Sequence, residues 1–85
     1  MKEEILKELE AIKEMVLTWK ASYLREASPD GGAQYLVEDF SLEIRTFVYP
    51  YVRRFCEMGC LNESEAMEFL DGCENEVEDL RNAVG

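Results

Sequence analysis

The sequence predicts an all-α fold, an antiparallel three-helix bundle whose helices run up, down and up. Apolar residues recur at helical spacing over three long segments. The two short stretches between these segments contain Pro, Gly and Asn, which end helices and form turns. A chain of 85 residues, 47% of them hydrophobic, suits a single helical domain over residues 1–85 with one modest core.

The first helix is expected over residues 2–27, which contain no Gly or Pro. Its core face follows spacings of four and three residues: Ile5, Leu9, Ile12, Val16, Trp19 and Tyr23. A second stripe lies beside this face and consists of Leu6, Leu17 and Leu24. Such a wide apolar arc suits a helix that contacts two neighbours. Residues 28–32 end the helix, because Pro29 disfavours helical geometry at Ser28, and Asp30 is a candidate cap for the next helix.

The second helix is expected over residues 32–58. Its predicted core face comprises Ala33, Val37, Phe40, Ile44, Phe47, Tyr51 and Phe55. Pro50 lies in the middle of the segment, where it removes one backbone hydrogen bond. Two interpretations remain open: a continuous helix kinked at Pro50, or two helices that meet near Tyr49. We favour the kinked helix, because the apolar phase is unbroken across Pro50.

The back of this second helix is unusually apolar. Tyr35, Leu42, Tyr49 and Cys56 recur every seven residues, nearly opposite the predicted core face. A helix in a monomeric bundle has no need of such a stripe, so self-association through it is the favoured interpretation. Isolated surface apolar residues and a wider core arc are the alternatives. With Val52 between the two faces and two arginines interleaved, the candidate interface is Tyr35, Leu42, Arg45, Tyr49, Val52, Arg53 and Cys56.

The second turn and the third helix are specified by local signals. Gly59 has the position of a left-handed helix C-cap, and Asn62 with Glu65 forms a capping box. The third helix is expected over residues 63–84, in an antiparallel hairpin with the second. Its core residues alternate at spacings of four and three: Ala66, Leu70, Cys73, Val77, Leu80 and Val84.

The charge balance excludes several classes of partner. Nineteen acidic and nine basic residues give a net charge of −10, which argues against binding of nucleic acid or an anionic membrane. The N-terminus has no apolar leader, and no run approaches the roughly 20 apolar residues of a membrane span. Three cysteines, an odd number, fit a reducing compartment, so we expect a cytoplasmic protein.

The sequence contains little that suggests catalysis. It has no histidine, so neither its serines nor its cysteines have a conventional base. Cys73 is expected about 16 Å along its helix from the turn that holds Cys56 and Cys60. A metal site made of all three thiols within one chain is therefore excluded, and we expect free thiols, no metal and no cofactor. Glu68-x-x-Asp71 and Glu76-x-x-Asp79 match the short half of the acidic pattern of all-α nucleotide pyrophosphatases, but the long half is missing.

The leading hypothesis is therefore a non-enzymatic protein–protein interaction module that forms a homodimer through the back of its second helix. Two alternatives remain. One is a Mg²⁺-dependent nucleotide hydrolase assembled from the acidic helices of two chains. The other is an acidic inhibitor that occupies the nucleic-acid-binding groove of another protein.

Overall fold

The computed structural model describes residues 2–27 and 34–84, and it confirms the all-α class. The elements are α1 (Glu3–Glu26), α2 (Gln34–Glu43), the π-helical turn η1 (Ile44–Val48), α3 (Tyr49–Glu57) and α4 (Glu63–Val84). The elements α2, η1 and α3 follow one another without a non-helical residue, so they form one rod, here called the middle helix. The predicted cap Asp30 and the predicted core residue Ala33 lie outside the described residues.

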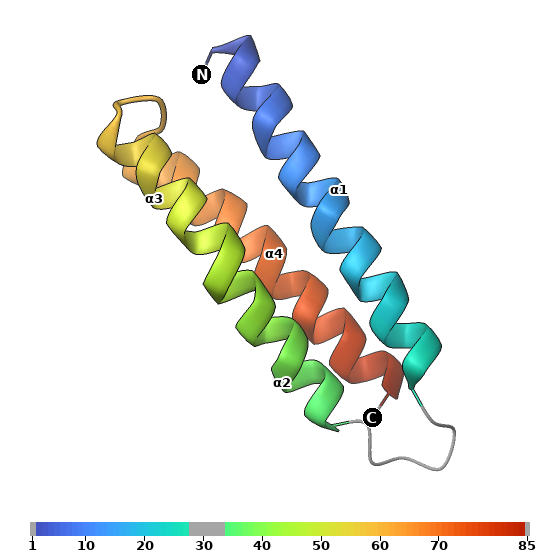
Figure 1. Cartoon of the computed structure of the whole chain (residues 1–85). Helices are drawn as coiled ribbons and strands as arrows, with labels where there is room; N and C mark the ends of the chain where they lie inside the picture. The colour runs from blue at the N-terminus through green and yellow to red at the C-terminus, as the bar shows by residue number, and fades with distance from the viewer. Residues whose placement is uncertain (1, 28–33, 85) are drawn as a thin grey trace.

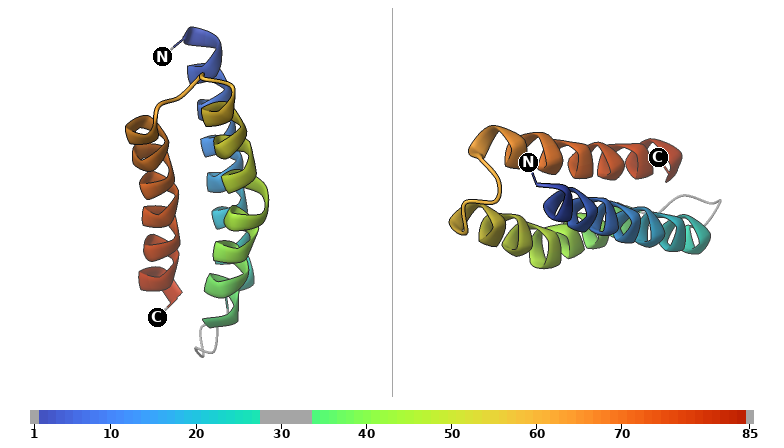
Figure 2. Two further views of the ribbon diagram at one scale, coloured as in Figure 1. Left: turned by 90° about the vertical axis from the view of Figure 1, so that its left-hand side faces the viewer. Right: turned by 90° about the horizontal axis from the view of Figure 1, so that it is seen from above.

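Three rods surround one core, and the molecule is elongated, with extents of 46 × 17 × 17 Å. α1 packs against α2 and α4, and α4 also packs against α2 and α3 (Figures 1 and 2). In Figure 1, α1 and α4 point the same way and the middle helix points the opposite way. The N-terminus therefore lies at the end of the bundle where α3 connects to α4.

α1 has the core face that its spacing predicts. Leu9, Ile12 and Val16 are buried, and the flanking apolar residues of that face pack against the core. Acidic residues occupy the first turn and Arg25 the last, which suits the helix dipole at both ends. The second apolar stripe of α1 remains exposed: Leu6, Leu17 and Leu24.

A π-helical turn interrupts the middle helix immediately before Pro50. The backbone N–H of Tyr49 donates to the carbonyl of Ile44, five residues earlier, instead of four. Pro50 has no N–H, and its ring crowds the carbonyl of the preceding turn, so a wider turn relieves the clash. The extra residue rotates all later side chains by about 100° relative to an uninterrupted α-helix. The kink predicted at Pro50 stays a prediction.

This rotation makes part of the predicted core wrong. Phe47 and Tyr51 were expected to face the core, yet they are 55% and 53% exposed. Their immediate neighbours Val48 and Val52 are buried in their place, Val52 to 1% exposure. The prediction of Phe47 and Tyr51 is wrong because it assumes 3.6 residues per turn throughout the segment, whereas the π turn holds one more residue.

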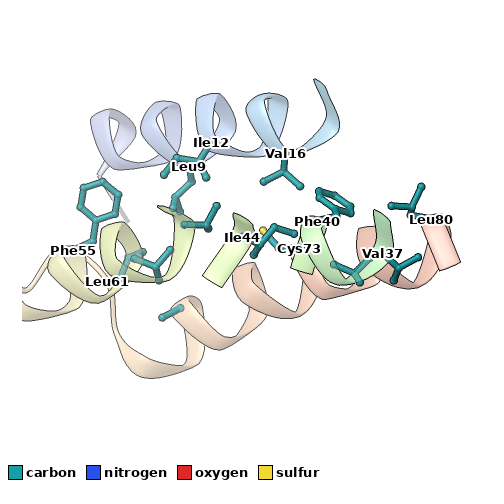
Figure 3. Packing of buried hydrophobic residues seen from close by; sticks show 14 residues of the cluster. Leu9, Ile12, Val16, Val37, Phe40, Ile44, Phe55, Leu61, Cys73 and Leu80 are labelled. Carbon is teal, nitrogen blue, oxygen red and sulfur yellow. The ribbon is translucent and has the colours of Figure 1, made fainter. Parts of the chain in front are cut away.

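The core is apolar throughout the described residues. Val16 of α1, Phe40 of α2 and Cys73 of α4 have no exposed surface, and Figure 3 shows them pointing toward one another from three different rods. The predicted core of α4 is confirmed, since its members are buried or packed against the cluster. Within the described ranges no buried polar or charged residue is found.

The turn between α3 and α4 has the predicted caps. Gly59 has φ of 76°, the left-handed conformation that favours glycine. The N–H of Cys60 donates to the carbonyl of Phe55 at 2.8 Å, as in a Schellman motif. Asn62 and Glu65 form the reciprocal capping box, with backbone-to-side-chain distances of 3.0 and 2.8 Å.

Candidate interaction surface

The structure divides the predicted interface into residues that face inward and residues that face outward. Val52 is buried, and Tyr49 and Cys56 are half-buried against the core. The prediction that Tyr49 and Cys56 lie on the back of the helix is wrong, because the π turn rotates both toward the core. A buried Val52 cannot contact a second copy unless the core unpacks.

Tyr49 holds α3 to α4. Its hydroxyl donates to Glu74 Oε1 of α4 at 2.8 Å. Burial, assisted by this hydrogen bond and by the charge of Glu74, raises the pKa of Tyr49 to about 12. Tyr23 makes an equivalent link from α1 to the middle helix, donating to Glu43 Oε1 at 2.9 Å.

The other four predicted interface residues lie on the outer surface. Tyr35 and Leu42 are 59% and 62% exposed, and Arg45 and Arg53 are also exposed. Among the described residues, neither these arginines nor Arg54 takes part in an ion pair within 4.0 Å. Their guanidinium groups are therefore available at the surface.

From the π turn onward, the apolar surface continues through residues that the sequence interpretation missed. Phe47, Tyr51 and Met58 are all more than half exposed. We call the five exposed apolar residues of this rod and its C-terminal end the outer row: Tyr35, Leu42, Phe47, Tyr51 and Met58. A signal for the altered phase was present, since Phe47 and Tyr51 are each followed by a valine that offers a second apolar register, and Pro50 lies beside them.

Aromatic rings extend the outer row toward α1. The rings of Phe47 and Trp19 lie 6.2 Å apart at an angle of 55°, and those of Tyr51 and Phe55 lie 6.1 Å apart. Trp19 is half-buried, so its ring covers part of the core and also contacts the exposed Phe47. The outer row thus rests on packed aromatic side chains that hold its central residues in place.

Negative charge is concentrated on one helix. α4 carries eight carboxylates and a single arginine, whereas the middle helix carries four carboxylates and three arginines. Two lysines of α1 neutralise part of α4: Lys20 lies 3.0 Å from Glu76 Oε1, and Lys13 lies 3.5 Å from Glu76 Oε2. The hydrogen bond to Glu76 raises the pKa of Lys20, although burial opposes it.

Thiols and carboxylates are placed as follows. All three cysteines are free, and burial raises the pKa of Cys73 to about 11, so this thiol is protonated at neutral pH. Across residues 2–27 and 34–84, no group of three or more Cys, Asp or Glu side chains converges as metal ligands would.

Over the same ranges, no helix has the length and apolar character needed to cross a membrane.

Comparison of the chain with protein-family models, with curated proteins and with solved structures finds no match in any of the three. The function is therefore inferred from the geometry and charge of the surface described above.

Proposed function

We propose that this chain is a non-enzymatic protein–protein interaction module that self-associates through the outer face of its middle helix. The outer row supports the proposal. Phe or Tyr buries roughly 150–250 Å² when covered, so each half-exposed ring leaves about 100 Å² of largely apolar surface in water. The three rings of the outer row, with the comparably exposed side chains of Leu42 and Met58, expose about 500 Å² together, which is at the upper end of what monomeric proteins show.

The composition of this face suits an interface. Tyr, Phe, Trp, Met and Arg are the residue types enriched where proteins meet. Phe47, Tyr51 and Met58 supply the apolar part, while Arg45 and Arg53 are exposed on the same rod. In a two-fold dimer each arginine can pair with a carboxylate of the other copy, because such an interface uses the same patch twice.

The charge distribution also favours this face. Two copies that met through α4 would bring eight carboxylates against eight others, with one arginine on each side. Like charges held close together are costly, whereas the middle helix is nearly balanced. The interface is therefore proposed on the middle helix and the adjoining edge of α1 that carries Trp19.

The centre of the proposed interface is Phe47. Covering its exposed part removes about 100 Å² of apolar area from water, which is worth about 2.5 kcal/mol at 25 cal/mol per Å². Phe47→Glu removes this contribution and places a charge in the interface. We expect it to weaken self-association at least about 50-fold. The matched control is Leu17→Glu, which changes an exposed apolar residue of α1 outside the outer row.

Size-exclusion chromatography with light scattering, from about 1 µM to about 1 mM protein, tests the proposal over the range of dissociation constants that it concerns. Wild type and Leu17→Glu should dimerise as concentration rises, and Phe47→Glu should remain monomeric. A wild-type protein that stays monomeric throughout the range would overturn the proposal, as would equal loss of dimer in both variants.

The two alternatives predict different behaviour. The acidic inhibitor has the concentration of charge on α4 in its favour, and its binding would weaken steeply with salt. The nucleotide hydrolase requires carboxylates of two copies to converge, and turnover of a nucleotide panel with Mg²⁺ decides it. We further propose a cytoplasmic location, because three free cysteines suit a reducing compartment.

A further inference from the structure

A second surface lies between α1 and α4, away from the outer row. Residues of both helices line a groove of about 440 Å³. The parts of α1 and α4 that form it lie toward the end of the bundle that holds the N-terminus (Figure 1). Leu6, Leu9 and Phe69 give the groove an apolar lining, and Leu6 is exposed. The volume lies in the range of pockets that bind small ligands or a few side chains.

The groove carries three carboxylates. Glu10 of α1 lies on one helix, and Glu65 and Glu68 of α4 lie on the other. Within the described residues, Glu10 and Glu68 form no ion pair within 4.0 Å. Their charges are therefore available to a partner.

The one basic residue of the groove is already engaged. Lys13 Nζ donates to the backbone carbonyl of Gly72 at 3.2 Å and lies 3.5 Å from Glu76 Oε2. These contacts hold the ammonium group against α4 and offset its charge. The groove thus presents net negative charge beside an apolar lining.

We infer that this groove binds a cationic amphipathic helix of another protein. Apolar side chains of that helix would cover Leu6 and Phe69, and its Lys or Arg side chains would reach Glu10 and Glu68. The lining extends over about two turns of each helix, roughly 10 Å, which matches the spacing of residues i, i+3, i+4 and i+7 in a helical ligand. A second copy of this chain fits poorly, because its net charge of −10 opposes the acidic groove.

This inference does not depend on self-association, because Phe47, the centre of the proposed dimer interface, packs against Trp19 and is not among the residues that line the groove. α1 contributes Leu6 and Glu10 to the groove it forms with α4, whereas it contacts the outer row through Trp19. Loss of the dimer in Phe47→Glu should therefore leave peptide binding unchanged. Peptide binding by this variant separates failure of one proposal from failure of the other.

The test uses a fluorescein-labelled peptide of Leu and Lys, about 14 residues or four helical turns long, with Leu at helical spacing. Fluorescence anisotropy is measured at about 0.15 M salt, where weak surface attraction is largely screened. One control peptide has the same composition in an order that forms no apolar face, and another replaces every Lys by Glu. Saturable binding of the first peptide alone is expected.

Two matched pairs of variants locate the binding site. Leu6→Asp changes an exposed leucine in the groove, and Leu24→Asp changes an exposed leucine of the same helix outside it. Glu68→Lys reverses an exposed charge in the groove, and Asp71→Lys reverses one on α4 outside it. We expect affinity to fall about tenfold in Leu6→Asp and about fivefold in Glu68→Lys, and less than about twofold in either control. Circular dichroism confirms that each variant is folded.

Backbone amide shifts in NMR provide a second measurement on the wild-type protein. Saturable shifts confined to residues 6–13 and 65–72 would support the assignment even if a variant failed to fold. Equal losses in Glu68→Lys and Asp71→Lys would show attraction to the acidic surface as a whole and would overturn the proposal. The absence of saturable binding would also overturn the proposal. So would equal affinity for the control peptide that has the same composition but forms no apolar face.

Discussion

Truncating either Tyr51 or Val52 to alanine tests which of these neighbouring side chains lies in the core after the π turn. Val52 is 1% exposed, so Val52→Ala removes about two buried methyl groups and leaves a small cavity. At about 0.8 kcal/mol for each group plus the cavity term, the free energy of unfolding should fall by about 2–3 kcal/mol. Tyr51 is half exposed, and Tyr51→Ala loses mainly its ring contact with Phe55, worth about 1 kcal/mol.

An uninterrupted α-helix predicts the opposite order. Tyr51 would then lie in the core, where truncation of a large aromatic costs about 3–5 kcal/mol, and Val52→Ala would cost less than about 1 kcal/mol. Urea denaturation followed by circular dichroism measures both values. In a domain of this size, each kcal/mol corresponds to roughly 4–8 °C in melting temperature.

Self-association must be separated from the effect of register, because Tyr51 also belongs to the outer row. A contribution from dimerisation grows with protein concentration, whereas the core contribution does not. The comparison is therefore made at several concentrations and extrapolated to the lowest. If Tyr51→Ala remains the more destabilising variant at low concentration, the π turn and the register argued from it are wrong.

Three further predictions concern individual contacts. Tyr49→Phe should lower the free energy of unfolding by about 1 kcal/mol in urea denaturation at neutral pH, because it removes the 2.8 Å hydrogen bond to Glu74. The pKa of Tyr49 is raised from 10.0 to about 12 in the folded state, so its stabilising contribution is complete below pH 10 and is lost as the pH rises toward 12. Wild type should therefore lose stability more steeply than Tyr49→Phe over that interval in alkaline denaturation, and identical slopes would contradict the assignment. Gly59→Ala should cost about 1–2 kcal/mol at a φ of 76°, whereas Gly72→Ala should be neutral or stabilising, since the added Cβ meets only the mobile end of a lysine and alanine favours a helix. Thermal melts that rank these two glycine variants in the reverse order would refute this reasoning. Glu76→Gln should cost about 1 kcal/mol at low salt, and less at 1 M salt, because the carboxylate contacts two lysines of α1. A loss that does not depend on salt would contradict the assignment of this contribution to the charge of Glu76.

The parts of the fold that local chemistry determines could be predicted from the sequence. α1 has a wide apolar arc without a Gly or Pro, and Leu9, Ile12 and Val16, which follow its unbroken spacing of three and four, are buried as predicted. The turn before α4 depends on Gly59 and on the Asn62–Glu65 pair, whose hydrogen bonds are all local. Such features require no knowledge of the neighbouring helices.

The register after Pro50 could not be determined in this way. Phe47, Val48, Tyr51 and Val52 are all apolar, so two adjacent helical faces offer comparable hydrophobicity. The choice between them depends on how the rods pack. In the structure the smaller valines occupy the crowded centre, and the aromatic rings lie at the edge, where Phe47 meets Trp19 of α1. This packing depends on all three helices, so the hydrophobic periodicity of one helix alone cannot predict it.

The π turn therefore links the core to the proposed interface. The extra residue that accommodates Pro50 turns Val48 and Val52 inward, turns Phe47 and Tyr51 outward, and brings Tyr49 to Glu74. Without the π turn, Tyr49 and Cys56 would lie on the back of the middle helix, and Phe47 and Tyr51 would be buried in the core. The exchange places two smaller valines in the core and two aromatic rings on the outer surface. A single backbone irregularity thus determines which aromatic residues lie on the outer surface, and the carboxylates of α4 favour the opposite side of the bundle for the proposed dimer interface.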